Sequence, residues 1–265
     1  MMNIPFTKAH GARNDFLLTW RDRLPSTFDA PSAALAICDR HTGAGADGWL
    51  LVSRAESADG AIELWNSDGS RSEISGNGTR CAAAFLIEAN RASENVRILT
   101  GAGVKHLRLL SREGHRFSFE MNMGAASIEH LRASILDYDA TILNVGNPQC
   151  AVFVEHFDFD WRSLGASIER HWQFPNRTNV SFIRHIDEHS LDVRFFERGA
   201  GETMSSGTGS TGAAAAAFAR GLVLSPVTVL TPAGPLDLRW DNRDILLAGP
   251  AEIVASGEFY RDAGS

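Results

Sequence analysis

The 265-residue sequence predicts an α+β fold of two pseudo-symmetric domains, each a strongly curved, mostly antiparallel sheet wrapped around a central helix. Three observations predict this fold: an internal repeat, many short apolar runs separated by turn residues, and one Ala-rich helical pattern in each half. We place the domains at residues 1–128 and 129–265, with the last few residues packing back on the first domain. Each domain is then long enough to hold a core of its own.

The internal repeat is the most informative feature. Residues Ser75–Ala84, SGNGTRCAAA, return as Ser206–Ala215, SGTGSTGAAA, 131 positions later. The same offset aligns Ile62–Asn66 with Val193–Glu197, and both runs have the apolar pattern of a strand. A repeat of this length predicts two related domains.

Strand-like runs outnumber helical ones, and Gly, Asp and Asn turns between them are typical of antiparallel hairpins. The clearest helices are predicted over Gly78–Ala89 and Gly209–Arg220, with weaker patterns over Ser32–Cys38 and Trp161–Arg170. Small Ala side chains would let strands approach the two clear helices from all sides. The predicted strands are Trp49–Val52, Ile62–Trp65, Val96–Leu99, His106–Leu110, Phe117–Met121, Ala151–Val154, Val180–Ile183, Leu191–Phe196, Val227–Leu230, Leu236–Trp240 and Ile245–Ala248.

Composition excludes several classes of function. With 25 basic and 32 acidic residues the net charge is −7, which disfavours nucleic acid and anionic membranes as partners. The longest apolar run, Ala213–Ala219, is far shorter than the ~20 residues of a membrane span, and the start of the chain lacks a secretion signal. Three scattered cysteines predict reduced thiols and a cytoplasmic protein. Only two lysines are present, which disfavours a pyridoxal phosphate enzyme.

The repeated Ser-Gly-x-Gly turn before a helix predicts an anion site, because its backbone N–H groups point the same way and the helix N-terminus adds positive charge. Two such turns facing each other would hold one carboxylate and stabilise an enediolate beside it. The simpler interpretation is that Ser75 and Ser206 only cap their helices. Repetition in matched settings favours the anion site.

Other patterns carry less weight. Gly43–Gly48 and Gly207–Gly212 both fit G-x-G-x-x-G, but neither opens a βαβ unit, so no dinucleotide site is expected. His185 and His189 lie in an acidic turn between strands and are expected to be solvated rather than bound to a metal. The cysteines are expected to be small buried hydrophobic residues, and are Cys38, Cys81 and Cys150.

The sequence resembles the diaminopimelate epimerases, and the resemblance covers nearly the whole chain. It implies two barrel-like domains, each around a central helix, which agrees with the repeat. The matching motifs are Phe6–Phe16, Asp39–Gly48, Asn66–Ser70, Ser75–Cys81, Asn144–Pro148, Phe174–Asn179 and Glu197–Thr203.

The resemblance implies cofactor-independent epimerisation of L,L-diaminopimelate to the meso form, in lysine and peptidoglycan precursor synthesis. In the family two cysteines flank the α-carbon, one thiolate removing the proton and one thiol replacing it. Thiols suit this role because their pKa is about 8.5. Here Ser75 and Ser206 stand at those positions, Gln149 replaces a histidine that polarises the first cysteine, and Gly48 replaces a common glutamine. We expect Glu197 beside the reacting centre.

The remaining site residues match the family. The resemblance implies a small diamino diacid substrate, no metal, a homodimer and a cytoplasmic location. It assigns the substrate's amino groups and distal carboxylate to Asn14, Asn66, Asn147, Asn179, Glu197 and Arg198, and the carboxylate at the reacting end to Gly76, Asn77, Gly207 and Thr208.

Three explanations of the two serines stay open. In the first, the serines are substitutions made to trap a substrate complex. In the second, a natural subgroup of the family catalyses the same epimerisation with serine, aided by Glu197. In the third, the chain has moved to another function. That other function is isomerisation of a different small amino or carboxylic acid, or amino-acid binding without catalysis.

Overall fold

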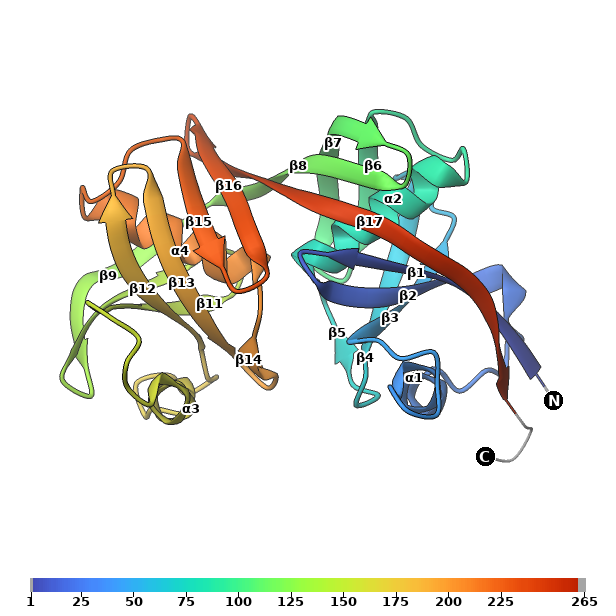
Figure 1. The fold of residues 1–265 in the computed structure, drawn as a ribbon, viewed down its shortest axis with the longest axis horizontal. Coiled ribbons are helices and arrows are strands. Elements are labelled where there is room, and N and C mark those ends of the chain that lie inside the picture. Colours follow the sequence, from blue (N-terminus) through green and yellow to red (C-terminus); the bar gives the residue numbers. More distant parts are fainter. Residues whose placement is uncertain (1, 262–265) are drawn as a thin grey trace. The chain divides into compact units, whose positions relative to one another are not determined.

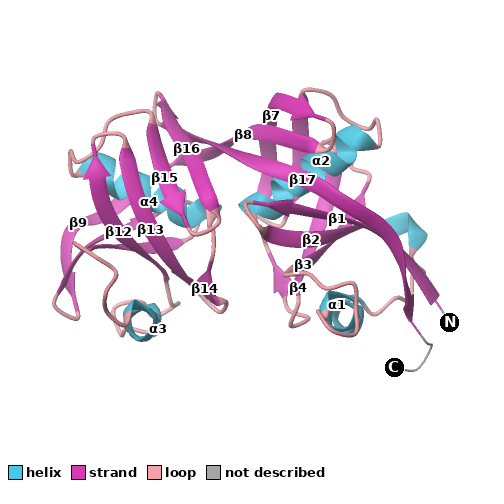
Figure 2. Cartoon of the chain, viewed as in Figure 1, coloured by secondary structure: helices cyan, strands magenta, loops and turns pink. Residues whose placement is uncertain are grey.

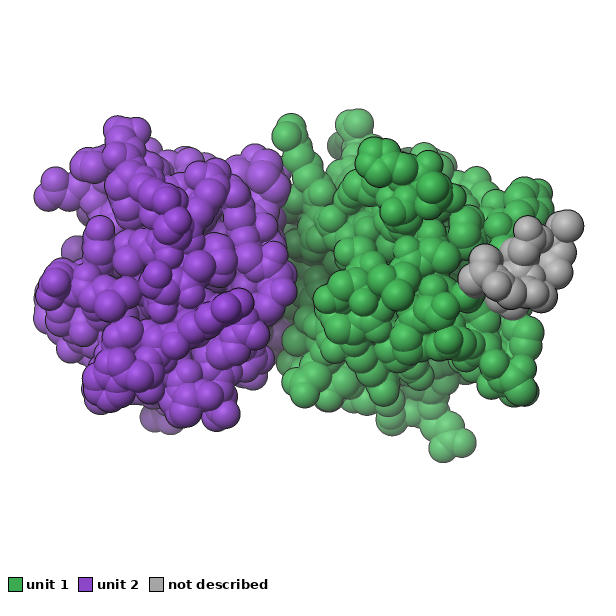
Figure 3. All heavy atoms as spheres, turned by 90° about the horizontal axis from the view of Figure 1, so that it is seen from below, with its two compact units in different colours: residues 1–121, 249–265 green, residues 122–248 purple. Residues whose placement is uncertain are grey.

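The computed structural model describes residues 2–261 and divides into two compact units (Figure 3). Unit 1 comprises residues 1–121 and 249–265, and unit 2 comprises residues 122–248. None of the described helices is long and apolar enough to cross a membrane.

The elements are labelled in Figure 1. From the N-terminus the chain forms β1 (Met2–Gly11), β2 (Asn14–Trp20), a 3-10 turn (Arg21–Arg23), α1 (Ala30–Cys38), β3 (Gly48–Ser53), β4 (Gly60–Asn66), β5 (Arg71–Ser72), α2 (Gly76–Glu88), β6 (Asn95–Thr100), β7 (Gly103–Glu113) and β8 (Arg116–Ala125). It continues with β9 (Ser127–Ile135), β10 (Tyr138–Asn144), β11 (Pro148–Phe153), α3 (Trp161–Glu169), β12 (Asn179–Asp187), β13 (Ser190–Glu197), β14 (Gly201–Thr203), α4 (Gly207–Ala219), β15 (Val227–Thr231), β16 (Gly234–Asp241) and β17 (Asp244–Arg261).

The two units repeat one topology. In unit 1, β2 pairs with β3 in parallel and β4 with β6 in parallel, while β1–β2, β3–β4, β4–β5 and β6–β7 are antiparallel. In unit 2, β11–β12 and β13–β15 are parallel, while β10–β11, β12–β13, β13–β14 and β15–β16 are antiparallel. Each strand of the first set therefore has a counterpart with the same pairing in the second.

One long strand serves both units. β17 pairs with β16 through Asp244–Ala248 in unit 2 and with β1 through Glu252–Arg261 in unit 1. β9 pairs with β10 in the same antiparallel sense within unit 2. The C-terminal part of β17 thus stands to β1 as β9 stands to β10.

A mostly buried helix lies at the centre of each unit, surrounded by strands (Figure 2). In α2 every residue of Gly76–Ile87 is buried. In α4 the run Ala213–Ala217 belongs to the core of unit 2, together with the side chains of Val229 and Leu236. The short Ala side chains let strands approach α4 closely on several sides. A second helix packs on the outside of each sheet, α1 near Trp49 and α3 near Phe182.

The predicted α+β class and the two central helices are confirmed. Both helices begin two residues before their predicted starts, because each turn serine is itself the N-cap. The strands β1, β2, β5, β9, β10 and β14 were absent from the prediction. β9, for example, is mostly exposed and rich in polar residues, so it lacks the apolar run that marked the other strands.

Candidate active site

The first turn places Ser75 in extended backbone directly before α2. Its Oγ accepts a hydrogen bond from the backbone N–H of Gly78 at 3.1 Å. Its carbonyl accepts from the backbone N–H of Thr79 at 2.8 Å and from the Thr79 hydroxyl at 2.7 Å. The serine cap satisfies the third amide of the helix and leaves the first two, of Gly76 and Asn77, for a ligand.

The second turn repeats this geometry in unit 2. The Oγ of Ser206 accepts from the N–H of Gly209 at 3.0 Å, and its carbonyl accepts from the N–H of Ser210 at 2.9 Å. The backbone angles of the two serines agree within a few degrees, at φ −132° and ψ 124° for Ser75 and φ −136° and ψ 122° for Ser206. Both predictions for the turn are therefore compatible: the serines are N-caps, and the helix ends beyond them suit anions.

In unit 1 the turn is joined to two other sequence motifs by side-chain amides. Asn77 Nδ2 donates to Asn14 Oδ1 at 3.2 Å, and Asn14 Nδ2 donates to Asp47 Oδ2 at 2.7 Å. Arg40 then bridges Asp47 and Asp15, with Nη2 at 2.7 and 2.8 Å from their oxygens. Burial opposes ionisation of Asp15, but hydrogen bonds from Arg40 and Lys8 outweigh this effect and hold the pKa of Asp15 below its ordinary value.

Asn66, the fifth predicted site residue of unit 1, has a different set of contacts. It ends β4, and its side-chain Nδ2 donates to Ser70 Oγ at 2.9 Å within its own turn. Its strand partner is Gly48, the residue after Asp47. Backbone pairing with Gly48 therefore places Asn66 near Asp47. The Asn66 side chain makes no hydrogen bond to Asn14 or Asp47 among the described contacts.

In unit 2 a chain of amides leads to the second turn. Gln149 Nε2 donates to Asn147 Oδ1 at 2.7 Å, and Asn147 Nδ2 lies 3.4 Å from the hydroxyl oxygen of Thr208 in α4. Gln149 is 1% exposed, and its Oε1 has no hydrogen-bond partner among the described residues. It packs against Gly212, where an added Cβ would lie 3.1 Å from Gln149 Cγ. Gln149 thus fixes the orientation of Asn147.

Asn179 holds the backbone of the other predicted binding residues. It begins β12, beside Gln149 on the neighbouring parallel strand. Its Oδ1 accepts from the N–H of Arg198 at 3.0 Å, and its Nδ2 donates to the carbonyl of Pro148 at 3.0 Å. The guanidinium of Arg198 is held by the carbonyl of Asn176 at 3.2 Å and stays exposed. An exposed guanidinium of this kind can bind a carboxylate.

Glu197 ends β13 and lies close to the second turn. The hydroxyl of Thr203 donates to its Oε1 at 2.6 Å. Burial raises the pKa of the Glu197 carboxyl, and hydrogen bonds from Thr203 and Ser206 oppose that rise. A carboxyl group with a raised pKa, held by hydroxyl groups beside the second turn, is suited to general acid–base catalysis.

A model of the diaminopimelate epimerase family matches residues 6–129 and 141–254 of this chain. The chain belongs to the diaminopimelate epimerase family. It is 37% identical to the diaminopimelate epimerase of Pelotomaculum thermopropionicum over 97% of this chain and 99% of the relative. It is 36% identical to that of Moorella thermoacetica with the same coverage of each chain. The family places this chain among the isomerases of the epimerase class.

Solved structures share the fold at low sequence identity. A phenazine biosynthesis protein of the PhzF family from Bacillus anthracis superposes with a TM-score of 0.74 at 16% identity, covering 97% of this chain and 99% of that one. A hydroxyproline epimerase from Agrobacterium vitis, with trans-4-hydroxy-L-proline bound, gives 0.73 at 16% identity, covering 100% and 93%. These likenesses confirm the predicted fold class.

The thiols of this diaminopimelate epimerase family member lie in its interior. All three cysteines are buried, as predicted. Burial raises the pKa of each to about 12, for Cys38, Cys81 and Cys150 alike. They are therefore protonated near neutrality and are not poised to act as thiolates.

Gly48 lies where apolar side chains fill the available space. A Cβ added there would lie 3.0 Å from the carbonyl oxygen of Trp65, 3.2 Å from Leu64 Cδ1 and 3.3 Å from Phe16 Cδ1. The ring of Phe16 also lies 3.4 Å from a Cβ built on Gly78, in the first turn. Phe16 therefore packs between the two glycines, and a longer side chain at position 48 would have to displace it.

Two charged residues support the turns without having been predicted as site residues. Arg80 is fully buried in α2, where it donates to Asn77 Oδ1 and, through Nε at 3.1 Å, to the carbonyl of Pro250. Burial lowers the pKa of Arg80 to about 10. Glu169 of α3 accepts from the N–H of Gly199 at 3.1 Å and so supports the turn after Glu197. In the sequence, a charged residue within the apolar pattern of the predicted helix was the signal that could have identified Arg80 as a supporting residue.

Two residues of β14 beside the second turn have different partners. The carboxylate of Glu202 forms an exposed ion pair with the guanidinium of Arg162 on α3, at 2.5 and 2.8 Å. The hydroxyl of Thr203 donates to Glu197.

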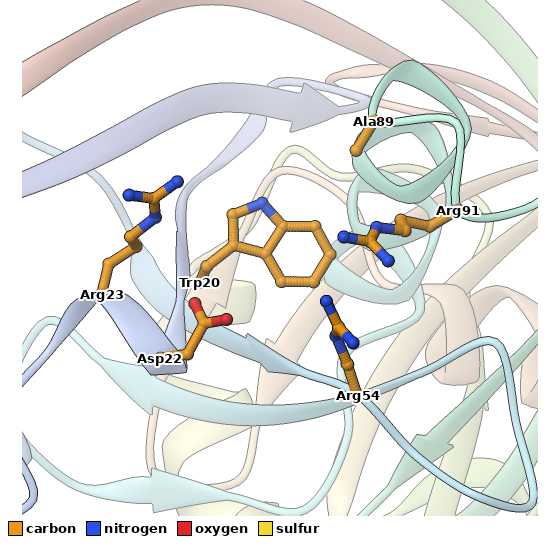
Figure 4. Close-up of a pocket in the computed structure, with 6 residues that line it drawn as sticks. All are labelled: Trp20, Asp22, Arg23, Arg54, Ala89 and Arg91. Carbon is orange, nitrogen blue, oxygen red and sulfur yellow. The ribbon is translucent and has the colours of Figure 1, made fainter.

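A separate pocket of about 160 Å³ lies in unit 1, away from the residues predicted to bind substrate (Figure 4). The side chains of Arg54 and Arg91 point toward the ring of Trp20, and its other lining residues are Asp22, Arg23 and Ala89. Ala89 is the C-cap of α2, so the pocket lies at the opposite end of this helix from Ser75.

Among the described residues, no group of three or more His, Cys, Asp and Glu side chains is arranged to hold a metal ion.

Proposed function

We propose that this chain epimerises L,L-diaminopimelate to meso-diaminopimelate without a cofactor. The observation that carries the proposal is the pair of matched turns, each with a serine cap and a set of amide side chains beside the helix N-terminus. The diaminopimelate epimerase relatives, similar over nearly the full chain, support the choice of substrate.

The substrate's carboxylate at the reacting end is expected to take the free amides of Gly76 and Asn77 in one turn and of Gly207 and Thr208 in the other. Removal of the α-proton places negative charge on this carboxylate, and fixed N–H donors stabilise that charge more in the transition state than in the ground state. Arg198 is suited to the distal carboxylate. The neutral amides of Asn14, Asn66, Asn147 and Asn179 suit a zwitterion, because they both donate and accept.

Proton transfer is the step most affected by this sequence. Ser75 and Ser206 occupy the two positions of the family's thiols, and a hydroxyl loses its proton far less readily than a thiol. We expect Glu197 to assist proton transfer at Ser206. We expect Gln149 to orient Asn147, whose side-chain amide contacts Thr208 at the second turn. A turnover much slower than that of a thiol enzyme follows from this set of groups.

The test is proton NMR of L,L-diaminopimelate in D₂O with abundant protein. Loss of the α-proton signal together with the appearance of the meso form is the expected result. Thermal stabilisation by the ligand without exchange would instead identify an amino-acid-binding relative. Neither exchange nor stabilisation would show that the substrate is a different small acid.

The double variant S75C/S206C sharpens this test, with S93C as a control that places a thiol in an exposed loop of unit 1. If only the acid–base groups are missing, epimerisation should rise by about 100-fold or more in the double variant. S93C should leave the rate unchanged. No gain in the double variant would contradict the assigned substrate.

A further inference from the structure

The two half-sites share a backbone and differ in their ionisable groups. Leu64 pairs with Ser72 on β4 and β5, and Phe195 pairs with Thr203 on β13 and β14, so the offset of the repeat is kept in the strand register. At the ends of β4 and β13 the same register places Asn66 in unit 1 and Glu197 in unit 2. An amide that cannot titrate thus stands where the other unit has a carboxyl group.

The neighbours of these residues differ in the same sense. Thr203 donates to the Glu197 carboxyl at 2.6 Å, whereas the hydroxyl of Ser72, its counterpart, lies 3.4 Å from the carbonyl of Ile74. Ser206 and Thr203 are both close enough to Glu197 to oppose the rise that burial causes in its pKa. The Ser206 Oγ accepts from the N–H of Gly209 at 3.0 Å, so this hydroxyl and the Glu197 carboxyl belong to one polar cluster at the second turn.

Among residues 2–261, Ser75 has no carboxyl group in the position that Glu197 takes beside Ser206. Its hydrogen bonds run to Gly78 and Thr79, neither of which has a side chain that titrates near neutrality. The carboxylates linked to this turn through Asn14 are those of Asp47 and Asp15, and both are paired with Arg40. For Asp15 burial opposes ionisation, but the hydrogen bonds from Arg40 outweigh it and hold its pKa below the ordinary value, which makes this carboxylate a weak base. The position that the family fills with histidine holds Gln149, a second amide.

We propose that Glu197 is the acid–base group of one face only, so that this chain exchanges the substrate's α-proton on that face much faster than it inverts the α-carbon. The inference rests on the proposed function. In the step, the C–H bond breaks, its electron pair passes into the adjacent carboxylate as an enediolate, and the proton moves to Glu197, directly or through Ser206. The carboxyl group exchanges this proton with solvent and returns a deuteron to the same face, with retention of configuration.

The experiment compares L,L- and meso-diaminopimelate in D₂O, measuring deuterium uptake and inversion for each. One of the two should take up deuterium with retention, and the other should stay nearly inert. Because a general acid–base group contributes about 10²–10⁴ in rate, exchange should exceed inversion by about 100-fold or more. Equal uptake by both epimers, or uptake equal to inversion, would overturn the inference and leave the proposed function standing. No uptake from either would overturn both.

Three variants locate the group. E197Q should lose exchange by about 100-fold or more, and E202Q, on the same turn but paired with the exposed Arg162, should retain it. Melting temperatures check that both variants are folded. S75C should raise inversion far more than S206C does, because it supplies a titrating group to the face that lacks one. Retained exchange in E197Q, or equal gains from the two cysteine variants, would also overturn the inference.

Discussion

A cysteine at either serine position should reveal how strongly each turn stabilises negative charge. In S75C the thiolate would accept the N–H of Gly78, as Ser75 Oγ does at 3.1 Å, at the positive end of a 13-residue helix. A charge at such a helix end is stabilised by about 0.3–1 kcal/mol, and by up to ~2 kcal/mol where partly buried. Since one pKa unit corresponds to about 1.36 kcal/mol, the S75C thiol should titrate about one unit below the ordinary value of about 8.5.

The S206C thiol has the same helix end but a carboxyl group beside it. Two like charges about 4 Å apart repel by ~4 kcal/mol at an effective dielectric constant of ~20, which exceeds the contribution of the helix. Once Glu197 is ionised, the pKa of the S206C thiol should therefore lie well above that of S75C. The difference between two turns of the same backbone geometry measures the charge on Glu197.

Alkylation by iodoacetamide as a function of pH is the assay, because the thiolate is the reactive form. The three native thiols are buried with pKa values of about 12 and should not contribute. S93C provides an exposed thiol of ordinary pKa. An S75C thiol that titrates with or above that of S93C, or together with that of S206C, would refute the reasoning.

Two further predictions concern stability. The pKa of Glu197 is raised in the folded state, so the contribution of its carboxyl group to the free energy of unfolding is fully present below the ordinary value of 4.5. That contribution is lost as the pH rises through the folded-state pKa. Because glutamine does not titrate, E197Q should gain stability relative to the parent over the same pH interval. Urea unfolding on both sides of this range checks the sign, and a constant difference between the two proteins would contradict it. G209A should cost about 1–3 kcal/mol by overpacking, because its Cβ would lie 2.7 Å from the ring of Phe195. G212A should cost less, since its Cβ would lie 3.1 Å from Gln149 Cγ, farther than the 2.7 Å at position 209, and equal losses in the two variants would argue against this account.

The predictable part of the fold came from local patterns. A Ser-Gly-x-Gly turn before an Ala-rich run indicates a capped helix, and both serines have that role. The repeat then predicted a second copy of the surrounding strands, and the same order of pairings is present in each unit. Polar strands such as β9 were beyond this reasoning, because their stability depends on backbone pairing rather than on an apolar face.

The site residues could be named from the family motifs, but not their contacts. Arg80 bonds the carbonyl of Pro250, 170 positions away along the chain, and only the return of β17 to unit 1 brings the two together. The hydrogen bond from Gly199 to Glu169 likewise joins α3 to the turn after β13. Sequence separation hides such contacts, because neither partner has a local pattern that specifies the other.

The repeat also shows why a common fold does not determine the chemistry of its two halves. Backbone geometry is set by the register of the strands and the serine caps, so both units keep a helix end that suits a carboxylate. Proton transfer depends instead on single side chains that the backbone tolerates in either form, such as Asn66 and its counterpart Glu197. Substitutions at these positions alter the reaction while the cradle for the substrate's carboxylate is retained. On the proposed function, serines at the two turns and an amide at position 149 are therefore compatible with substrate binding, and we expect the single carboxyl of Glu197 to determine which face of the α-carbon stays reactive.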